Sequence, residues 1–208
     1  MITNPETAPA SAYYSGRVKQ VIDKYYGEGP SVLKDILLIH SQSVTRLALQ
    51  IVSLHPELSF DVPFVVEAAM LHDIGIVRCD VPAIRCFGTE PYLLHGRVGA
   101  EMMRAEGLPR HARVCERHTG AGLTRQAILE EHLPLPAEDF LPETPEEQLI
   151  CFADKFFSKT HLDRQKTMAQ AEHSLMRFGS EGVARFREWE RLFAFPESAG
   201  EMPNAVLG

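Results

Sequence analysis

The stretch EAAMLHDIGIV, from Glu67 to Val77, decides how this sequence is interpreted. It has the pattern of the last turns of a buried helix, which ends on His72 and Asp73 and is expected to stop at Gly75 in the left-handed conformation. Two polar groups at the end of an apolar helix are costly to bury without partners. A metal ion would supply a partner, and such an ion would need further ligands from elsewhere in the sequence.

Length and composition favour one compact domain. The chain has 208 residues, of which 45% are hydrophobic and 24% are charged, which is enough for a sizeable core. We expect a disordered lead over residues 1–12, a single helical bundle over 13–195 and a loose tail over 196–208. No signal peptide and no apolar run of membrane length is recognised, so a soluble, cytoplasmic protein without membrane contact is expected.

Charge and cysteine usage exclude other classes. The formal net charge is −7, and Lys and Arg are scattered, which argues against broad nucleic-acid binding. A polyanionic substrate would therefore need positive charge gathered locally at its binding site. The four cysteines form no C-x-x-C pair and are expected to be reduced thiols.

The hydrophobic period indicates an all-α fold, because it is helical in nearly every segment and no alternating run argues for a strand. The loop over 77–94 follows the His-Asp pair and is a candidate lid or specificity element. Helices are expected over 13–26, 31–54, 62–74, 95–106, 109–118, 123–132, 145–160, 164–178 and 181–194.

Two histidines lie on apolar seams. His40 fills the gap between Leu37 and Val44 on an inward helix face. A single histidine in such a seam is more often a hydrogen-bonded core residue than a ligand. His72 and Asp73 point about 100° apart on a helix, so they chelate one ion only if the last turn opens, or else two ions are present.

Asp154 makes the sharpest case for a ligand. It lies between Ile150 and Phe157 on one helical stripe, and a carboxylate there should be inside and should need a paired charge or a metal. Lys155 is expected to point to the side, so it would not supply that charge.

His95 opens one expected helix and His118 closes another, directly before the glycine-containing stretch HTGAGLT. Each has an ordinary alternative as a cap or surface residue. His111 and His132 lie beside charged or loop residues and are expected to be solvated.

Together these residues form the ligand set of a transition-metal site, and six ligands exceed what one open ion uses. Two ions bridged by Asp73 would resolve its geometry. The alternative is a helical protein with core histidines. The six residues are His40, His72, Asp73, His95, His118 and Asp154.

The order His, His-Asp, Asp, with HDIG intact at 72–75, resembles the HD-domain superfamily of metal-dependent phosphohydrolases. The stretches LLHGRVGAEMM, RHTGAGLT and CFADKF look like the small stand-alone HDIG proteins. More distantly, they are similar to the bacterial HD hydrolases that split diadenosine tetraphosphate at a di-iron site.

The resemblance implies a helical bundle with His40, His72, Asp73 and Asp154 on one metal. Asp73 would bridge to a second metal, which His95 and His118 also hold. It implies divalent transition metals, Fe, Mn, Ni, Co or Zn, and Asp73 and His72 as catalytic residues.

The sequence departs from the family at two places. Many relatives carry Lys directly after HDxG, where this chain has Ile76. Arg78 and Lys155 are therefore the first candidates for phosphate contacts, with Arg97 and Arg125 behind them. The stretch after Asp154 reads KFFSKTH, unlike the KIEPNR-like run of the dinucleotide hydrolases.

The expected function is hydrolysis of a phosphoester or phosphoanhydride in a nucleotide or small phosphorylated metabolite, by a monomer or homodimer. The alternatives are an HD-type mixed-valence di-iron oxygenase, a metal-bound regulatory module without turnover, and the helical protein with core histidines.

Overall fold

The structure is a computed structural model, and it describes residues 12–195. The loose tail expected over 196–208, and nearly all of the expected lead, lie outside these residues. The α-helices are α1 (Gly16–Tyr26), α2 (Val32–Leu54), α3 (Val62–Leu71), α4 (His95–Ala105), α5 (Pro109–Arg117), α6 (Arg125–Glu130), α7 (Pro145–Asp154), α8 (Met168–Leu175) and α9 (Ser180–Leu192).

The expectation of an all-α fold is confirmed, with one small exception. Residues 77–94 were expected to form a loop without strands, and they contain a two-stranded antiparallel hairpin of β1 (Asp80–Val81) and β2 (Cys86–Phe87). Short 3-10 helices cover Pro56–Leu58, Ile74–Arg78, Pro82–Ile84, Tyr92–Leu94 and Met176–Phe178. Two-residue strands carry too little alternation to show in a sequence pattern.

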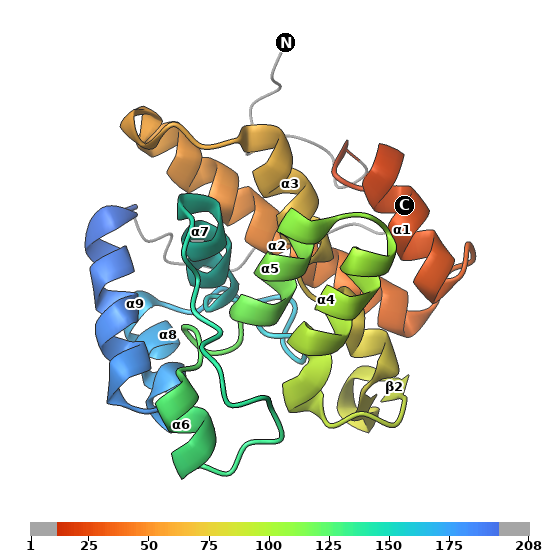
Figure 1. The fold of residues 1–208 in the computed structure, drawn as a ribbon. Coiled ribbons are helices and arrows are strands. Elements are labelled where there is room, and N and C mark those ends of the chain that lie inside the picture. Colours follow the sequence, from red (N-terminus) through yellow and green to blue (C-terminus); the bar gives the residue numbers. More distant parts are fainter. Residues whose placement is uncertain (1–11, 196–208) are drawn as a thin grey trace.

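Two large hydrophobic clusters form most of the core. One joins side chains of α2, α3, α7, α8 and α9, and the other joins α1 to α2, α3, α4 and α5. Figure 1 shows α9 and α1 on opposite sides of the bundle, with α2, α3, α5 and α7 between them. On α2, Leu37 belongs to one cluster and Val44 to the other. His40 lies between them, so the seam where the two clusters meet carries a polar group.

Helix α3 ends earlier than the sequence predicted. The expected helix over 62–74 stops at Leu71, and Asp73 has φ −102° and ψ 10° before the 3-10 helix begins. The last turn therefore opens, which was one of the two conditions for His72 and Asp73 to act together.

The expected role of Gly75 was wrong. It is not among the glycines with positive φ and lies inside the 3-10 helix over Ile74–Arg78. A Cβ atom at this position would lie 2.1 Å from the carbonyl oxygen of His95 and 2.4 Å from the amide nitrogen of Gly99. Gly75 is needed because α4 packs directly against its backbone.

Helix α7 is shorter than the expected helix over 145–160, because it ends at Asp154. The amides of Lys155, Phe156 and Phe157 bond back to carbonyls only three residues earlier, at 3.1–3.3 Å. This tight turn leads the chain out of the helix. The N-terminal capping box of Thr144 and Glu147 that starts α7 is present.

The other expected helices occur within a few residues of their predicted bounds, except that α6 and α8 are shorter than predicted. The aromatic face of α9 covers the bundle, as Phe186 packs against Phe152 of α7 with ring centroids 5.0 Å apart. The four cysteines are buried free thiols. Among the described residues, no helix is long and apolar enough to cross a membrane.

We predict that Gly75→Ala destabilises the fold by about 2 kcal/mol or more, because the added methyl group meets backbone atoms that cannot move aside cheaply. Gly29→Ala is the matched control, since a Cβ there meets nothing within 4 Å. Denaturant unfolding of both variants tests this. Equal stability of the two variants would contradict the close approach of α4.

Candidate metal centre

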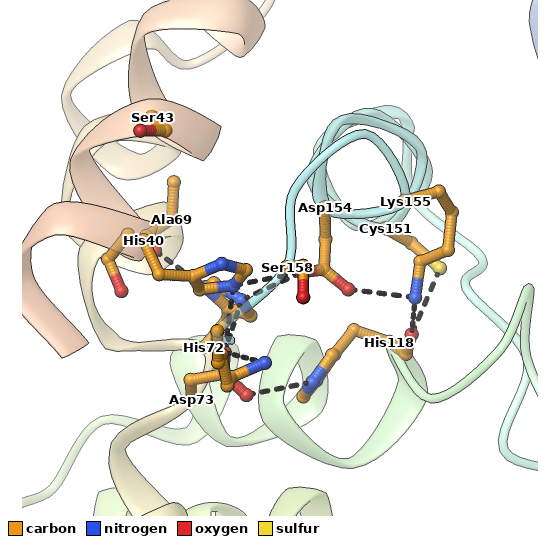
Figure 2. Close-up of polar contacts among 12 residues, drawn as sticks. His40, Ser43, Ala69, His72, Asp73, His118, Cys151, Asp154, Lys155 and Ser158 are labelled. Carbon is orange, nitrogen blue, oxygen red and sulfur yellow. Dashed lines mark hydrogen bonds and ion pairs between the residues drawn. The ribbon is translucent and has the colours of Figure 1, made fainter. Parts of the chain in front are cut away.

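The six candidate ligands come together where five helical segments meet. Figure 2 shows five of them, His40, His72, Asp73, His118 and Asp154. His40 comes from α2, His72 and Asp73 follow α3, and Asp154 is the last residue of α7. His95 begins α4, and His118 follows α5. All six side chains are buried.

The ligand atoms form two groups that share Asp73. The first group is His40, His72, Asp73 and Asp154, the second is Asp73, His95 and His118, and the atoms of each group lie within 4.8 Å of one another.

Asp73 offers a different oxygen to each group. Its Oδ2 is 3.0 Å from Nε2 of His40 and 3.1 Å from Nε2 of His72. Its Oδ1 is 3.4 Å from Nε2 of both His95 and His118. The carboxylate therefore has the arrangement that a bridging ligand needs.

Three of the histidines have a tautomer that local structure fixes. In His72, His95 and His118, Nδ1 lies close to the carbonyl oxygen three residues earlier, and a carbonyl only accepts hydrogen bonds. Nδ1 therefore carries the proton and, in the neutral ring, Nε2 keeps a free lone pair for a metal. The acceptors are the carbonyl oxygens of Ala69 at 2.7 Å, Tyr92 at 2.6 Å and Cys115 at 2.7 Å.

The second group shows most directly that a cation fits. Burial lowers the pKa of His95 to about 3 and also lowers the pKa of His118, so both rings are neutral near pH 7. Their Nε2 atoms nevertheless face each other at 2.9 Å. Two lone pairs at that distance repel, and an ion that both coordinate removes the repulsion.

The first group also contains polar atoms that lack hydrogen bonds. Nε2 of His40, Nε2 of His72 and both oxygens of Asp73 are buried without a hydrogen-bond partner in residues 12–195. Buried polar groups of this kind need an explanation, and a bound ion is one of the usual ones. The residues therefore fit divalent transition metals, which imidazole and carboxylate ligands suit.

The charges of the first group are strongly coupled. Burial opposes the charged form of His72, but the carboxylates of Asp73 and Asp154 raise its pKa to about 9. Although burial alone would raise it, the ammonium of Lys159 and the ring of His72 hold the pKa of Asp73 well below its usual range. The proton on His72 and the ammonium of Lys159 supply positive charge to the metal-free carboxylates.

The Lys155 side chain was expected to point away from Asp154, and this expectation was wrong. Its Nζ lies 2.8 Å from Oδ2 of Asp154 and donates to the carbonyl oxygen of His118 at 2.8 Å. Lys155 follows the last helical residue, and its long stem reaches back to the neighbouring carboxylate. It therefore links the end of α7 to the segment after α5.

Lys159 also lies in the site, although the sequence did not predict it there. Its Nζ lies 2.6 Å from Oδ2 of Asp73, and its side chain is 12% exposed. The expected helix over 145–160 would have kept Lys159 on a continuing helix, whereas the turn after Asp154 carries it into the site. The departure of KFFSKTH from the family pattern was the only sequence signal at this position.

A cavity of about 420 Å³ opens beside the candidate ligands. His95, His118 and Asp154 contribute to its wall, together with Tyr92 and Phe178. Its charged lining consists of the basic residues Lys155, Lys159, Lys166 and Arg177 and the acidic residues Glu131 and Asp154. The cavity is therefore more basic than the chain as a whole.

Four other residues differ from expectation in their placement or burial. Arg78, Arg97 and Arg125 are exposed and are not among the cavity-lining residues of the described chain. His111 was expected to be solvated but is buried, with Nε2 3.2 Å from Glu67 and its ring against Phe64. An adjacent carboxylate and an aromatic ring make that burial favourable. His132 is exposed, as expected.

Comparison with known proteins identifies the family. The HD domain profile matches residues 37–158, which is more than half of the chain and includes all six candidate ligands. The protein therefore belongs to the HD domain family, as the sequence resemblance indicated.

Among curated proteins, the chain is 31% identical over 188 residues to a tRNA (cytidine(56)-2'-O)-methyltransferase of Thermoplasma volcanium; this match covers 86% of the chain and 49% of the relative. It is 40% identical over 101 residues to an uncharacterized protein of Methanocaldococcus jannaschii, covering 48% of the chain and 52% of the relative. The chain thus spans about half the length of these relatives.

Among solved structures, the HD domain of the L. monocytogenes phosphodiesterase PgpH, in complex with cyclic-di-AMP, aligns with a TM-score of 0.48 and 14% identity. The alignment covers 86% of this chain and 99% of that chain.

We predict that the chelator-treated protein loses stability as the pH falls from about 6.5 toward about 4. His95 stays neutral in the fold because its pKa is lowered to about 3, whereas the unfolded chain binds a proton below its ordinary pKa of 6.5. Unfolding therefore takes up protons in this window, and stability rises with pH. Thermal unfolding at about pH 5 and about pH 7 measures the slope.

The control is His95→Asn, which removes the titrating group and should flatten this slope. An unchanged slope in that variant would show that other groups cause the acid sensitivity.

Proposed function

We propose that the protein is a metal-dependent phosphohydrolase that cleaves a phosphoester or phosphoanhydride of a small phosphorylated substrate at a dinuclear site. The observation that carries this proposal is the sharing of Asp73, with one oxygen facing each of two groups of buried ligands. A single bound ion would not require the two oxygens of Asp73 to face separate ligand groups. A site that binds no ion would require this arrangement even less.

Bound divalent ions would supply an acidified water and would withdraw negative charge from the phosphoryl oxygens. The chain's own residues set the geometry for this chemistry. The three Nδ1 hydrogen bonds hold the imidazole rings with Nε2 inward, and the Asp73 carboxylate fixes the spacing of the two groups. We assign Asp73 and His72 to the catalytic centre on this basis.

The cavity supports a phosphorylated substrate. Lys159 and Lys166 place positive charge on its wall, and Lys155 adds a third ammonium that already contacts Asp154 and the His118 carbonyl. Tyr92, which is 38% exposed, offers an aromatic surface beside His95, with ring centroids 4.6 Å apart. Basic groups next to an aromatic ring suit a nucleotide, so nucleotides are the first substrates to test.

The methyltransferase name of the Thermoplasma relative describes a protein of which the chain matches 49%. Methyl transfer does not by itself require paired groups of buried imidazole and carboxylate ligands. Hydrolysis uses every one of the six residues, so it explains this part of the molecule better.

A mixed-valence di-iron oxygenase would use the same ligands. The lysines of the cavity favour an anionic substrate, which a phosphohydrolase requires. The two functions separate in one assay, because oxygenation consumes oxygen and hydrolysis proceeds without it.

We expect about two equivalents of metal per chain, by elemental analysis of protein purified without added metal or chelator, and phosphate release from nucleotides or p-nitrophenyl phosphate without oxygen. Asp73→Ala should abolish both metal binding and activity with helicity largely retained. His118→Ala should deplete one ion more than the other.

The control is His173→Ala, because His173 is exposed on α8. It should keep the metal content and activity of the unaltered protein. Full activity of Asp73→Ala would exclude the dinuclear site. Two iron ions with oxygen uptake and no phosphate release would favour the oxygenase.

A further inference from the structure

Among residues 12–195, Lys159 is the cation closest to the shared carboxylate of Asp73. Its Nζ lies 2.6 Å from Oδ2 of Asp73 and also 5.8 Å from the centroid of the Tyr92 ring. Its side chain lines the 420 Å³ cavity. The ammonium group of Lys159 thus contacts the candidate ligand Asp73 and also borders the cavity where a substrate would bind.

The contacted oxygen belongs to one ligand group only. Oδ2 faces His40 and His72 of the four-residue group, whereas Oδ1 faces His95 and His118. An ion held by the four-residue group would use Oδ2, the atom that the ammonium contacts. Lys159 and that ion therefore require the same lone pairs, and two cations this close repel each other.

We propose that Lys159 is an internal counter-ion of the metal-free centre, which gives up Oδ2 when the four-residue group takes a metal and then contacts a phosphoryl oxygen in the cavity. This inference rests on the proposed phosphohydrolase function. In this inference, metal binding causes the Lys159 ammonium to change its contact from Oδ2 of Asp73 to a phosphoryl oxygen.

The neighbouring basic residues are less suited to this exchange. Lys155 contacts both Asp154 and the carbonyl oxygen of His118 at 2.8 Å, so its ammonium is held by α7 and the segment after α5. Lys166 lines the same cavity, but its Nζ contacts the backbone oxygen of Lys155 at 3.3 Å. Lys159 lies in the non-helical chain after α7, and its flexible stem allows the ammonium to turn from Asp73 toward the cavity.

The test compares Lys159→Met with Lys166→Met, which removes the same charge from the same cavity without touching Asp73. Mn²⁺ binding to chelator-treated protein is measured by titration calorimetry, and free Mn²⁺ is counted by paramagnetic resonance. We expect Lys159→Met to bind Mn²⁺ about tenfold more tightly at one of two sites, since a competing ion pair is gone. The second site and Lys166→Met should stay close to the unaltered protein.

A second measurement tests the contact with phosphate. In Mn²⁺-loaded protein, inorganic phosphate should inhibit hydrolysis about tenfold more weakly in Lys159→Met, and KM should rise more than kcat falls. Lys159→Arg keeps the charge and should restore most of both properties. Lys159→Gln replaces the Met variant if that variant does not fold.

Unchanged or weaker Mn²⁺ binding in Lys159→Met, or a gain equal to that of Lys166→Met, would overturn the exchange while the phosphohydrolase proposal stands. Unchanged inhibition by phosphate would overturn the second contact. If the unaltered protein binds no Mn²⁺ and releases no phosphate from any substrate, the proposed function itself fails.

Discussion

The carboxylate of Asp73 is fully buried, its ammonium contact in the described chain is Lys159 at 2.6 Å from Oδ2, and the surrounding structure is arranged around it. Burying an unpaired carboxylate is costly, so positive charge must be near it. Helix α3 ends before Asp73, which frees the side chain to face two directions. Gly75 then lets α4 approach the backbone closely enough to bring His95 to Oδ1. The core thus positions a group that it could not bury alone.

Helix ends explain why the site suits a cation. His72 caps the C-terminus of α3, His118 caps that of α5, and His95 caps that of the short helix over Tyr92–Leu94. Each histidine donates its Nδ1 proton to the carbonyl oxygen three residues earlier, because carbonyl oxygens near a helix end can accept a side-chain donor. Asp154 is the last residue of α7, so the negative C-terminal ends of α3, α5 and α7 converge on one place. Asp73 follows the C-terminal end of α3, where a negative charge is unfavourable unless a cation lies beside it.

Periodicity singled out His40, His72 and Asp154 as candidates, because a polar side chain on an inward helix face interrupts an apolar stripe. Asp73, His95 and His118 were recognised from their places at predicted helix ends and from the family resemblance. Periodicity failed where tertiary contact decides the outcome. Gly75 has the usual signature of a helix stop, and only the packing of α4 reveals its other role. Lys159 was invisible because the end of α7 was placed about six residues too late, and a periodic pattern locates the end of a helix poorly. The order of the candidate ligands could be predicted from the sequence. The position of Lys159, whose positive charge balances the carboxylates, could not.

An acidic chain can still contain the proposed phosphate site. A net charge of −7 describes the whole surface, but exposed charges are screened over about 10 Å at ordinary ionic strength, whereas charges in a partly enclosed cavity are screened much less. Three of the four cations on the cavity wall, Lys155, Lys159 and Lys166, come from one segment of twelve residues that follows α7. The tight turn after Asp154 therefore does more than end a helix: it gathers enough positive charge beside the carboxylates to attract a small anion, while the outer surface still disfavours a long one.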